Sequence, residues 1–328
     1  MNKFQAILAT EENSQIKIEK KELSFDDLPR EEVLIKVKYS SINFKDGLVL
    51  NGNKGKVMRK FPMIPGIDLS GIVIKSSVEK FKEGDEVLAT GSGLSEVTWG
   101  GYSEYACLNS NKIVHIPKEI GLKNSMAIGT AGFTAMLCIM ALQKNGINKE
   151  KNIIVTGASG GVGSIALVLL SKMGYSVTGS TGDKENFDLL KKLGASDCIL
   201  RDELIIDPKP IASAKWGGAI DTVGGQILST VISQLSNNSS VSSCGNVAGI
   251  NLNTSVLPFI LRGVNLLGID SVNCPYDLRL EAWSRLANNL PYERLENLTN
   301  TINFDELFDV SKKILNGEII GRTVVKIS

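Results

Sequence analysis

The segment Thr156-Gly157-Ala158-Ser159-Gly160-Gly161-Val162-Gly163 decides the fold of this chain. It follows the short apolar run 152–156 and precedes the apolar run 164–173, which is typical of a tight turn between a buried strand and a helix. Gly160 has no Cβ, so the backbone there can approach a pyrophosphate, and Gly163 lets the helix pack closely on its strand. The free N–H groups at the start of the helix attract phosphate.

This segment therefore predicts a dinucleotide-binding loop, with Ser159, Gly160, Gly161, Val162 and Gly163 around the pyrophosphate. Ala158 replaces the first glycine of the usual G-x-G-x-x-G pattern, and Gly157 is the residue that can supply the missing turn freedom. A tight strand-to-helix turn that holds no ligand is the alternative.

Strands and helices alternate on both sides of this loop. Further strands are expected at 176–180, 198–200, 219–222, 239–244 and 266–269, with helices at 184–193 and 226–235. Such alternation predicts an α/β fold with a doubly wound parallel sheet covered on both faces. We place this domain at residues 125–270 and take 257–267 as a candidate edge for subunit pairing.

The regions outside 125–270 lack the regular alternation of strands and helices. Residues 1–124 are β-rich and punctuated by Gly and Pro, with strands expected at 33–39, 72–74 and 84–88. Residues 271–328 contain helices at 279–289 and 304–316 and a strand at 322–326. We expect this last segment to return to the first domain.

The composition is that of a globular protein without a nucleic-acid or membrane partner. A chain of 328 residues with 43% apolar and 22% charged side chains is typical of a globular protein with two domains. The formal net charge of +1, from 36 basic and 35 acidic residues, argues against a nucleic-acid partner. The apolar run 126–142 is shorter than the roughly 20 residues of a membrane span. Together with five scattered cysteines and no leader-like start, this predicts a cytoplasmic protein that has no membrane partner.

The end of the second predicted strand indicates which dinucleotide binds. NAD sites place an Asp or Glu there, on the ribose hydroxyls, whereas Thr181 stands at that position here. Ser180 and Thr181 can donate hydrogen bonds to a 2′-phosphate, and Lys184 can neutralise its charge. Asp183 argues the other way if it points inward, and a solvated position at the helix start is the alternative for Lys184. The pattern favours NADPH.

Several blocks identify a family. They are Ser41-Ile42-Asn43-Phe44-Lys45-Asp46-Gly47, residues 59–68, 127–138 and 156–164, Pro258-Phe259-Ile260-Leu261-Arg262, and Gly321-Arg322-Thr323. In them the chain resembles the medium-chain dehydrogenase/reductase superfamily on its zinc-free, quinone oxidoreductase-like side. More narrowly, it is similar to the acrylyl-CoA reductase (NADPH) family. The resemblance covers nearly the whole chain and implies a GroES-like β-rich catalytic domain beside a Rossmann domain, in a homodimer.

The resemblance also implies cofactor contacts. Ser180, Thr181 and Arg201 would surround the adenosine ribose phosphate, and Asn246, Ile260 and Ser271 would follow the nicotinamide half. Further positions inside the matching blocks are Phe44, Thr134, Gly182 and Arg322. The family usually has tyrosine where this chain has Phe44, so no phenolic hydroxyl is available there as a proton donor.

A catalytic zinc ion is not expected. Such a site needs three Cys, His or carboxylate ligands, and His115 is the single histidine. Zinc relatives carry Gly-His-Glu where this chain has Pro65-Gly66-Ile67-Asp68. Without a Lewis acid, reduction of a conjugated alkene is less demanding than oxidation of an alcohol, provided that donors stabilise the developing enolate.

We therefore expect a small-molecule substrate, with acrylyl-CoA as the leading candidate and a quinone or free enone as the alternative. A non-catalytic NADPH-binding regulatory protein is the rival from another class. Candidate catalytic residues are Asn43 as a donor to the enolate or cofactor, Asp46 as the residue that fixes its loop, and Arg59 as a contact for CoA phosphates. Purely structural roles for Asn43 and Asp46, and simple surface solvation of Arg59, are the alternatives.

Overall fold

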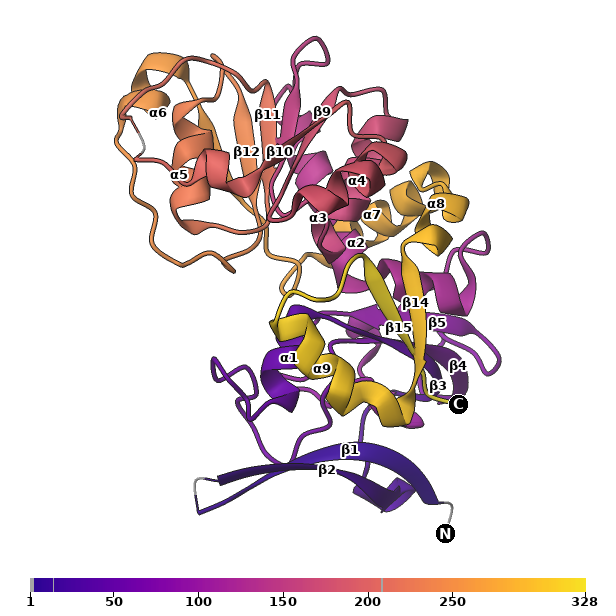
Figure 1. Cartoon of the computed structure of the whole chain (residues 1–328). Helices are drawn as coiled ribbons and strands as arrows, with labels where there is room; N and C mark the ends of the chain where they lie inside the picture. The colour runs from indigo at the N-terminus through magenta and orange to yellow at the C-terminus, as the bar shows by residue number, and fades with distance from the viewer. Residues whose placement is uncertain (1–2, 14, 208) are drawn as a thin grey trace. The chain divides into compact units, whose positions relative to one another are not determined.

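The computed structural model describes residues 3–13, 15–207 and 209–328. The chain divides into two compact units (Figure 1). Unit 1 comprises residues 1–130, 271–287 and 295–328, and unit 2 comprises residues 131–270 and 288–294. The boundary before the Rossmann segment therefore lies at 130/131 rather than at the expected 124/125, and seven C-terminal residues belong to unit 2.

Unit 2 is built on a six-stranded sheet in which every strand pairs in parallel. The strand order is β10-β9-β8-β11-β12-β13, which is the order of a Rossmann fold (Figure 1). This result confirms the predicted doubly wound sheet. The strands are β8 (Ile153–Val155), β9 (Val177–Thr181), β10 (Asp197–Leu200), β11 (Gly218–Asp221), β12 (Ser240–Ser243) and β13 (Asn265–Gly268).

Helices connect these strands, because parallel neighbours need a crossover. They are α3 (Gly161–Lys172), α4 (Phe187–Leu193), α5 (Gly225–Ser233) and α6 (Leu257–Arg262). Each predicted helix of this region starts or ends within about one turn of the observed one. The candidate edge 257–267 is only partly a strand: its first half is α6, and β13 is the edge strand at that end of the sheet.

Helix α2 (Gly121–Lys144) is longer than the apolar run 126–142 that it contains. By length and composition it could cross a membrane, but 89% of its most apolar 18-residue window is buried inside the protein. Burial of this kind is typical of a core helix. The helix is interrupted at Gly129, whose φ of 52° and ψ of −162° are non-helical.

Unit 1 contains a seven-stranded sheet in the order β14-β15-β3-β4-β5-β7, with β6 also pairing with β3. Apolar residues of these strands form its core, which includes Val33, Ile35, Leu69 and Val325. The strands are β3 (Val33–Ile42), β4 (Asp68–Ser76), β5 (Glu86–Thr90), β6 (Tyr105–Leu108), β7 (Val114–His115), β14 (Thr299–Asn303) and β15 (Arg322–Lys326).

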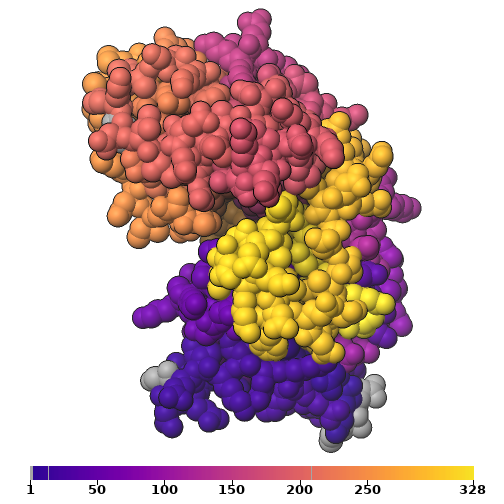
Figure 2. Space-filling view, in the orientation of Figure 1, coloured from indigo at the N-terminus to yellow at the C-terminus, as the bar shows by residue number. Residues whose placement is uncertain are grey.

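The C-terminal segment completes unit 1, as expected from the sequence. Strand β15 pairs antiparallel with β3, and the C-terminal residues lie against N-terminal ones in Figure 2. A separate hairpin, β1 (Lys3–Glu12) with β2 (Gln15–Ser24), was not foreseen as individual strands. The remaining helices of the chain are α1 (Phe44–Leu50), α7 (Tyr276–Asn289), α8 (Tyr292–Asn297) and α9 (Leu307–Leu315).

Candidate cofactor site and catalytic cluster

The predicted nucleotide loop joins β8 to α3 in a compact turn. Gly157 has φ 59°, and a Cβ there would lie 2.4 Å from Thr222 Oγ1, so Gly157 supplies the freedom that Ala158 lacks. A Cβ on Gly163 would lie 2.3 Å from the Gly157 carbonyl oxygen, so the helix packs directly on the turn. A Cβ on Gly160 would meet nothing closer than 3.3 Å. The two glycines thus serve the two different purposes predicted for them, close packing and open approach.

Helix α3 starts with exposed donors. Its N-cap is Gly160, and no side chain caps its first turn. Four N–H groups at a helix start lack intrahelical partners and carry a partial positive charge. The start of α3 at Gly160, Gly161 and Val162 thus has N–H groups that no side chain caps and that an anion could accept.

The end of β9 carries the residues expected at the adenosine ribose. Thr181 Oγ1 lies 3.1 Å from Ser159 Oγ and accepts a hydrogen bond from Asn186 Nδ2. Ser180 is different, because its side chain is fully buried and its Oγ has no partner among the described residues. Ser180 is therefore less suited than Thr181 to contact a ligand directly.

Charged residues surround the strand end. The Arg201 guanidinium lies against Gly182, where a Cβ would be 3.0 Å from Arg201 Cζ. Arg201 is 58% exposed, and its only ion pair among the described residues is a loose one with Asp202 at 3.6 Å. The Asp183 carboxylate caps the short turn that follows it, because it accepts a hydrogen bond from Glu185 N at 2.9 Å. Lys184 begins a short 3-10 turn and is exposed. Arg201 and Lys184 thus bring two positive charges to this end of unit 2, beside several carboxylates, and no carboxylate stands at the Thr181 position itself.

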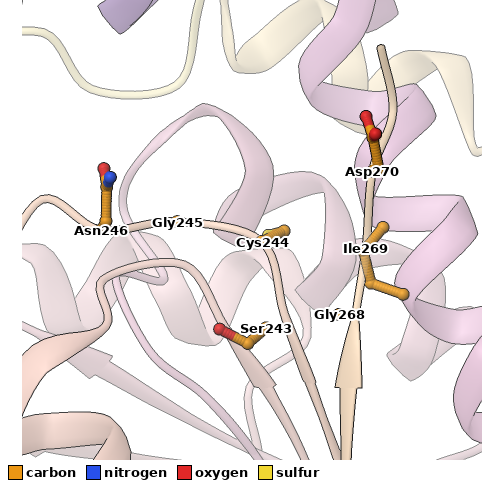
Figure 3. Close-up of a pocket in the computed structure, with 7 residues that line it drawn as sticks. All are labelled: Ser243, Cys244, Gly245, Asn246, Gly268, Ile269 and Asp270. Carbon is orange, nitrogen blue, oxygen red and sulfur yellow. The ribbon is translucent and has the colours of Figure 1, made fainter. Parts of the chain in front are cut away.

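An open pocket of about 600 Å³ lies at the carboxyl ends of β12 and β13. Ligands of open parallel sheets bind at this edge. Figure 3 shows its lining side chains, with the Asn246 amide and the Asp270 carboxylate at its rim. The lining residues are Ser243, Cys244, Gly245, Asn246, Gly268, Ile269 and Asp270. Asn246 was predicted from the resemblance, whereas Cys244 and Asp270 were not.

The other predicted cofactor residues are dispersed. Thr134 is buried on α2 in unit 2, and Ile260 is exposed on α6. Phe44, Ser271 and Arg322 belong to unit 1. Asp221 was missed. It ends β11, accepts from Thr156 Oγ1 at 2.7 Å and from Gly224 N at 2.9 Å, and burial raises its pKa.

In unit 1, polar residues converge on the buried carboxylate of Asp68. It accepts hydrogen bonds from Thr130 N at 3.0 Å, Thr130 Oγ1 and Ser41 Oγ at 2.5 Å each, and Asn43 Nδ2 at 2.9 Å. Gly129 makes this possible, because a Cβ there would lie 2.6 Å from Asp68 Oδ2. Asp68 is the residue that follows Ile67 in the segment compared with Gly-His-Glu.

Asn43 is fully engaged inside this cluster. Its Nδ2 lies 2.9 Å from Asp68 Oδ2 and 3.1 Å from Asp46 Oδ2, and its Oδ1 accepts from Arg322 at 3.0 Å. An amide has only two hydrogens, and both have carboxylate acceptors here. Asn43 therefore has no free donor for an enolate, which favours a positioning role over the donor role considered from the sequence.

Asp46 and Arg322 complete the cluster. The Asp46 carboxylate accepts from the backbone N–H groups of Asn43 at 2.8 Å and Ile67 at 3.0 Å, as expected of a residue that fixes its loop. Burial, and then the neighbouring Asp68 charge, raise the pKa of Asp46 to about 7. Arg322 is buried and donates to Ala127 O, and burial lowers its pKa.

The remaining candidates lie at the surface of unit 1. Lys45 pairs with Glu96 at 2.6 Å and not with Asp46, and Arg59 approaches Glu96 at 3.7 Å. Arg59 is 69% exposed, so its charge is accessible to an anionic ligand. Phe44 is 37% exposed. Sequence reasoning missed Glu96, Ser41 and Thr130, because only the fold brings them to their partners.

The chain has no arrangement suited to zinc in the part that the structure describes. No group of three or more His, Cys, Asp or Glu side chains could hold a metal ion there. His115 stacks on Phe81, with ring centroids 4.7 Å apart, and lies 3.1 Å from Asp85. These contacts indicate a structural role for His115.

Two family models match the chain. Residues 29–118 match the alcohol dehydrogenase GroES-like domain, and residues 161–288 match the zinc-binding dehydrogenase model. The first match lies within unit 1, and the second begins inside the nucleotide loop at Gly161 and covers five of the six strands of the parallel sheet.

Whole-length relatives are also similar. The acrylyl-CoA reductase AcuI of Ruegeria pomeroyi is 43% identical over 97% of both chains. The putative quinone oxidoreductase YhfP of Bacillus subtilis is 43% identical over 99% of both chains, and its structure with NAD bound superposes with a TM-score of 0.95. The structure of the yhdH oxidoreductase of Salmonella enterica with NADP is 42% identical, covers 99% of this chain and 100% of that one, and has a TM-score of 0.96.

Proposed function

Since this chain belongs to the zinc-free, acrylyl-CoA reductase and quinone oxidoreductase-like branch of the medium-chain dehydrogenase/reductase superfamily, we propose that it reduces the activated double bond of acrylyl-CoA to give propanoyl-CoA with NADPH. The observation that carries this proposal is the glycine loop on a Rossmann sheet, in a chain similar over its whole length to an acrylyl-CoA reductase.

The cofactor choice rests on the end of β9. Thr181 replaces the carboxylate of NAD sites, and the exposed Arg201 guanidinium beside Gly182 suits a 2′-phosphate. We assign Ser159 to Gly163, Thr181, Gly182 and Arg201 to the pyrophosphate and adenosine end. Asn246 and the pocket beyond β12 and β13 would hold the nicotinamide end. If Arg201→Ala reduces the preference for NADPH over NADH, this assignment is supported.

When bound, the nicotinamide supplies a hydride to the β-carbon of the conjugated double bond. The chain's own residues bind and orient the cofactor, and in unit 1 they hold a rigid polar cluster. We propose that Asn43 and Asp46 hold the segment around them in place and do not contact the substrate. Their polar atoms already form hydrogen bonds with Asp68, Arg322 and backbone groups. Arg59 remains the candidate contact for CoA phosphates.

The decisive experiment follows NADPH absorbance with acrylyl-CoA, with crotonyl-CoA, a simple quinone and NADH as comparisons. We expect the highest kcat/KM with acrylyl-CoA and NADPH. A higher kcat/KM with the quinone would replace the proposal by the activity named for the Bacillus relative. Absence of NADPH oxidation with every acceptor would favour a binding protein without catalysis.

We also propose a homodimer that pairs through the β13 edge, in the cytoplasm. The edge of the sheet lacks a neighbour among the described strands, and apolar side chains are exposed beside it. Ile260 and Leu261 on α6 are 69% and 61% exposed, and Leu266 on β13 is 39% exposed. An unpaired edge with an apolar rim is a common pairing surface. The five free thiols are in keeping with a reducing compartment.

A further inference from the structure

Two of the five cysteines meet, although they are far apart in sequence. Cys138 lies on α2 and Cys244 directly follows β12, both in unit 2. Their side chains lie close enough for the Cys244 thiol to be the main cause that raises the pKa of Cys138. The segments that carry them are also joined, because the Ser242 hydroxyl donates to the Cys138 carbonyl oxygen at 3.0 Å. The pair is therefore held together by the packing of α2 on β12.

The two thiols differ in accessibility. Cys138 is completely buried, whereas Cys244 is half-buried and lines the 600 Å³ pocket (Figure 3). The Cys244 thiol also donates to the Asp221 carbonyl oxygen at 3.5 Å. A small reagent that enters the pocket thus reaches Cys244 before Cys138.

We propose that the Cys138–Cys244 pair is an oxidation site at which peroxides convert the two thiols into a disulfide beside the cofactor pocket. In the first step the Cys244 sulfur attacks one peroxide oxygen, the O–O bond breaks, and Cys244 becomes a sulfenic acid while water leaves. In the second step the Cys138 sulfur attacks the Cys244 sulfur, the S–O bond breaks, and a second water leaves. Two thiols are oxidised, and one hydrogen peroxide is reduced.

The order of the steps agrees with the surroundings of Cys138. The neighbouring Cys244 thiol, and then burial, raise the pKa of Cys138 well above its usual range. A thiol that stays protonated is a poor nucleophile. Cys138, which is also buried, therefore does not react first with the peroxide, and it attacks only the sulfenic acid that forms beside it on Cys244.

The disulfide would reach the cofactor site through the chain next to Cys244. Gly245 and Asn246 also line the pocket. The backbone at Gly245 is tightly packed, because a Cβ there would lie 1.9 Å from the Thr222 carbonyl oxygen. Closing the disulfide pulls the Cys244 sulfur away from Asp221 O and reshapes the pocket wall. We expect NADPH affinity to fall by about 5-fold or more, the lower range of measured couplings between sites.

The test treats the full-length protein, free of NADPH, with hydrogen peroxide. We expect intact mass to fall by two hydrogen atoms, peptide mapping to locate a Cys138–Cys244 disulfide, and NADPH fluorescence titration to show the weakened binding. Dithiothreitol should restore both mass and binding. Cys244→Ser should block the mass change, and Cys138→Ser should stop the reaction at the sulfenic acid, which a dimedone probe detects.

Cys198→Ser is the matched control, because Cys198 is a half-buried free thiol of the same unit. It should react like the wild type. A disulfide between other cysteines, no disulfide in the wild type, or a disulfide that leaves NADPH affinity unchanged would each overturn the proposal. The inference rests on the proposed cofactor site but not on the substrate. Untreated protein that fails to bind NADPH would instead count against the proposed function.

Discussion

At the scale of single residues, Asp68 organises unit 1. Its carboxylate is buried and accepts from Thr130, Ser41 and Asn43, and Arg322 joins the cluster through Asn43 Oδ1 and Ser41 Oγ. A buried carboxylate is tolerated only when such donors replace its hydration. The cluster is therefore a set of mutually dependent groups, in which loss of one member leaves others unpaired.

Asp68→Asn tests this dependence. The amide would present N–H groups to the donors of Thr130 and Ser41, so we expect a loss of about 3 kcal/mol in the free energy of unfolding. Chemical denaturation measures it. Asp305→Asn is the control, because Asp305 forms an exposed ion pair with Lys20 and should change stability by less than about 0.5 kcal/mol. Equal effects of the two substitutions would contradict the assigned role.

Asp46 predicts a dependence of stability on pH. Its folded-state pKa of about 7 lies above the ordinary value of 3.8, so its ionisation opposes folding. The stability contributed by the protonated form is complete below about pH 4 and is lost as pH rises through 7. Between pH 5 and 8 the wild type should therefore lose stability relative to Asp46→Asn, with a slope of up to about 1.4 kcal/mol per pH unit. Thermal melts at several pH values measure this, and parallel curves for the two proteins would disprove it.

At the scale of elements, two interruptions of regular structure shape the proposed sites. The break in α2 at Gly129 turns the Thr130 N–H toward Asp68, and the turn 157–163 starts α3 without a side-chain cap. Both use backbone that a side chain would obstruct. The backbone geometry at these two glycine-containing segments thus exposes the N–H group of Thr130 and the first N–H groups of α3.

Two substitutions in the glycine loop can distinguish its role in packing from its role in ligand binding. Gly163→Ala should lower both the Tm and the affinity for NADPH, because its Cβ would lie 2.3 Å from the Gly157 carbonyl oxygen. Gly160→Ala should lower the Tm much less than Gly163→Ala and still weaken NADPH binding, since its Cβ would lie 3.3 Å rather than 2.3 Å from the same carbonyl oxygen. Differential scanning fluorimetry and fluorescence titration give the two readouts. If both variants bind NADPH like the wild type, the loop is not the pyrophosphate site.

At the scale of the whole molecule, the sheets of the two units end differently. Strand β15 pairs with β3 in unit 1, and in unit 2 the last strand, β13, pairs only with β12. The first arrangement covers a sheet edge with β15 and β14, whereas the second leaves a free edge among the described strands. The free edge is the surface that we propose for subunit pairing.

The double variant Leu261→Lys with Leu266→Lys tests the dimer. Charges on this exposed apolar rim should oppose edge pairing, so light scattering should give the mass of a dimer for the wild type and of a monomer for the variant. Ile74→Lys, at a similarly exposed apolar side chain of β4 in unit 1, should stay dimeric. A monomeric wild type, or a variant that remains dimeric, would exclude the β13 edge.

The sequence by itself determined the Rossmann sheet, the nucleotide loop and the order of the domains. These features depend on local rules: alternation of apolar strands and helices, and glycines where a Cβ would obstruct the turn. Asn43 and Asp46 were also chosen as candidates from one short block, within which Asp46 accepts from Asn43 N.

Only the tertiary structure decided which partners these residues have. Asn43 meets Asp68 across 25 residues and Arg322 across 279, so its amide is already satisfied. Ser180 was predicted as a phosphate contact, but the sheet buries it and leaves Thr181 beside Ser159. Cys138 and Cys244 are more than 100 residues apart in the sequence, and the packing of unit 2 brings their side chains together. The physical reason is common to all three: a local pattern specifies the conformation of its own segment, whereas long-range packing decides which polar atoms meet and which remain free.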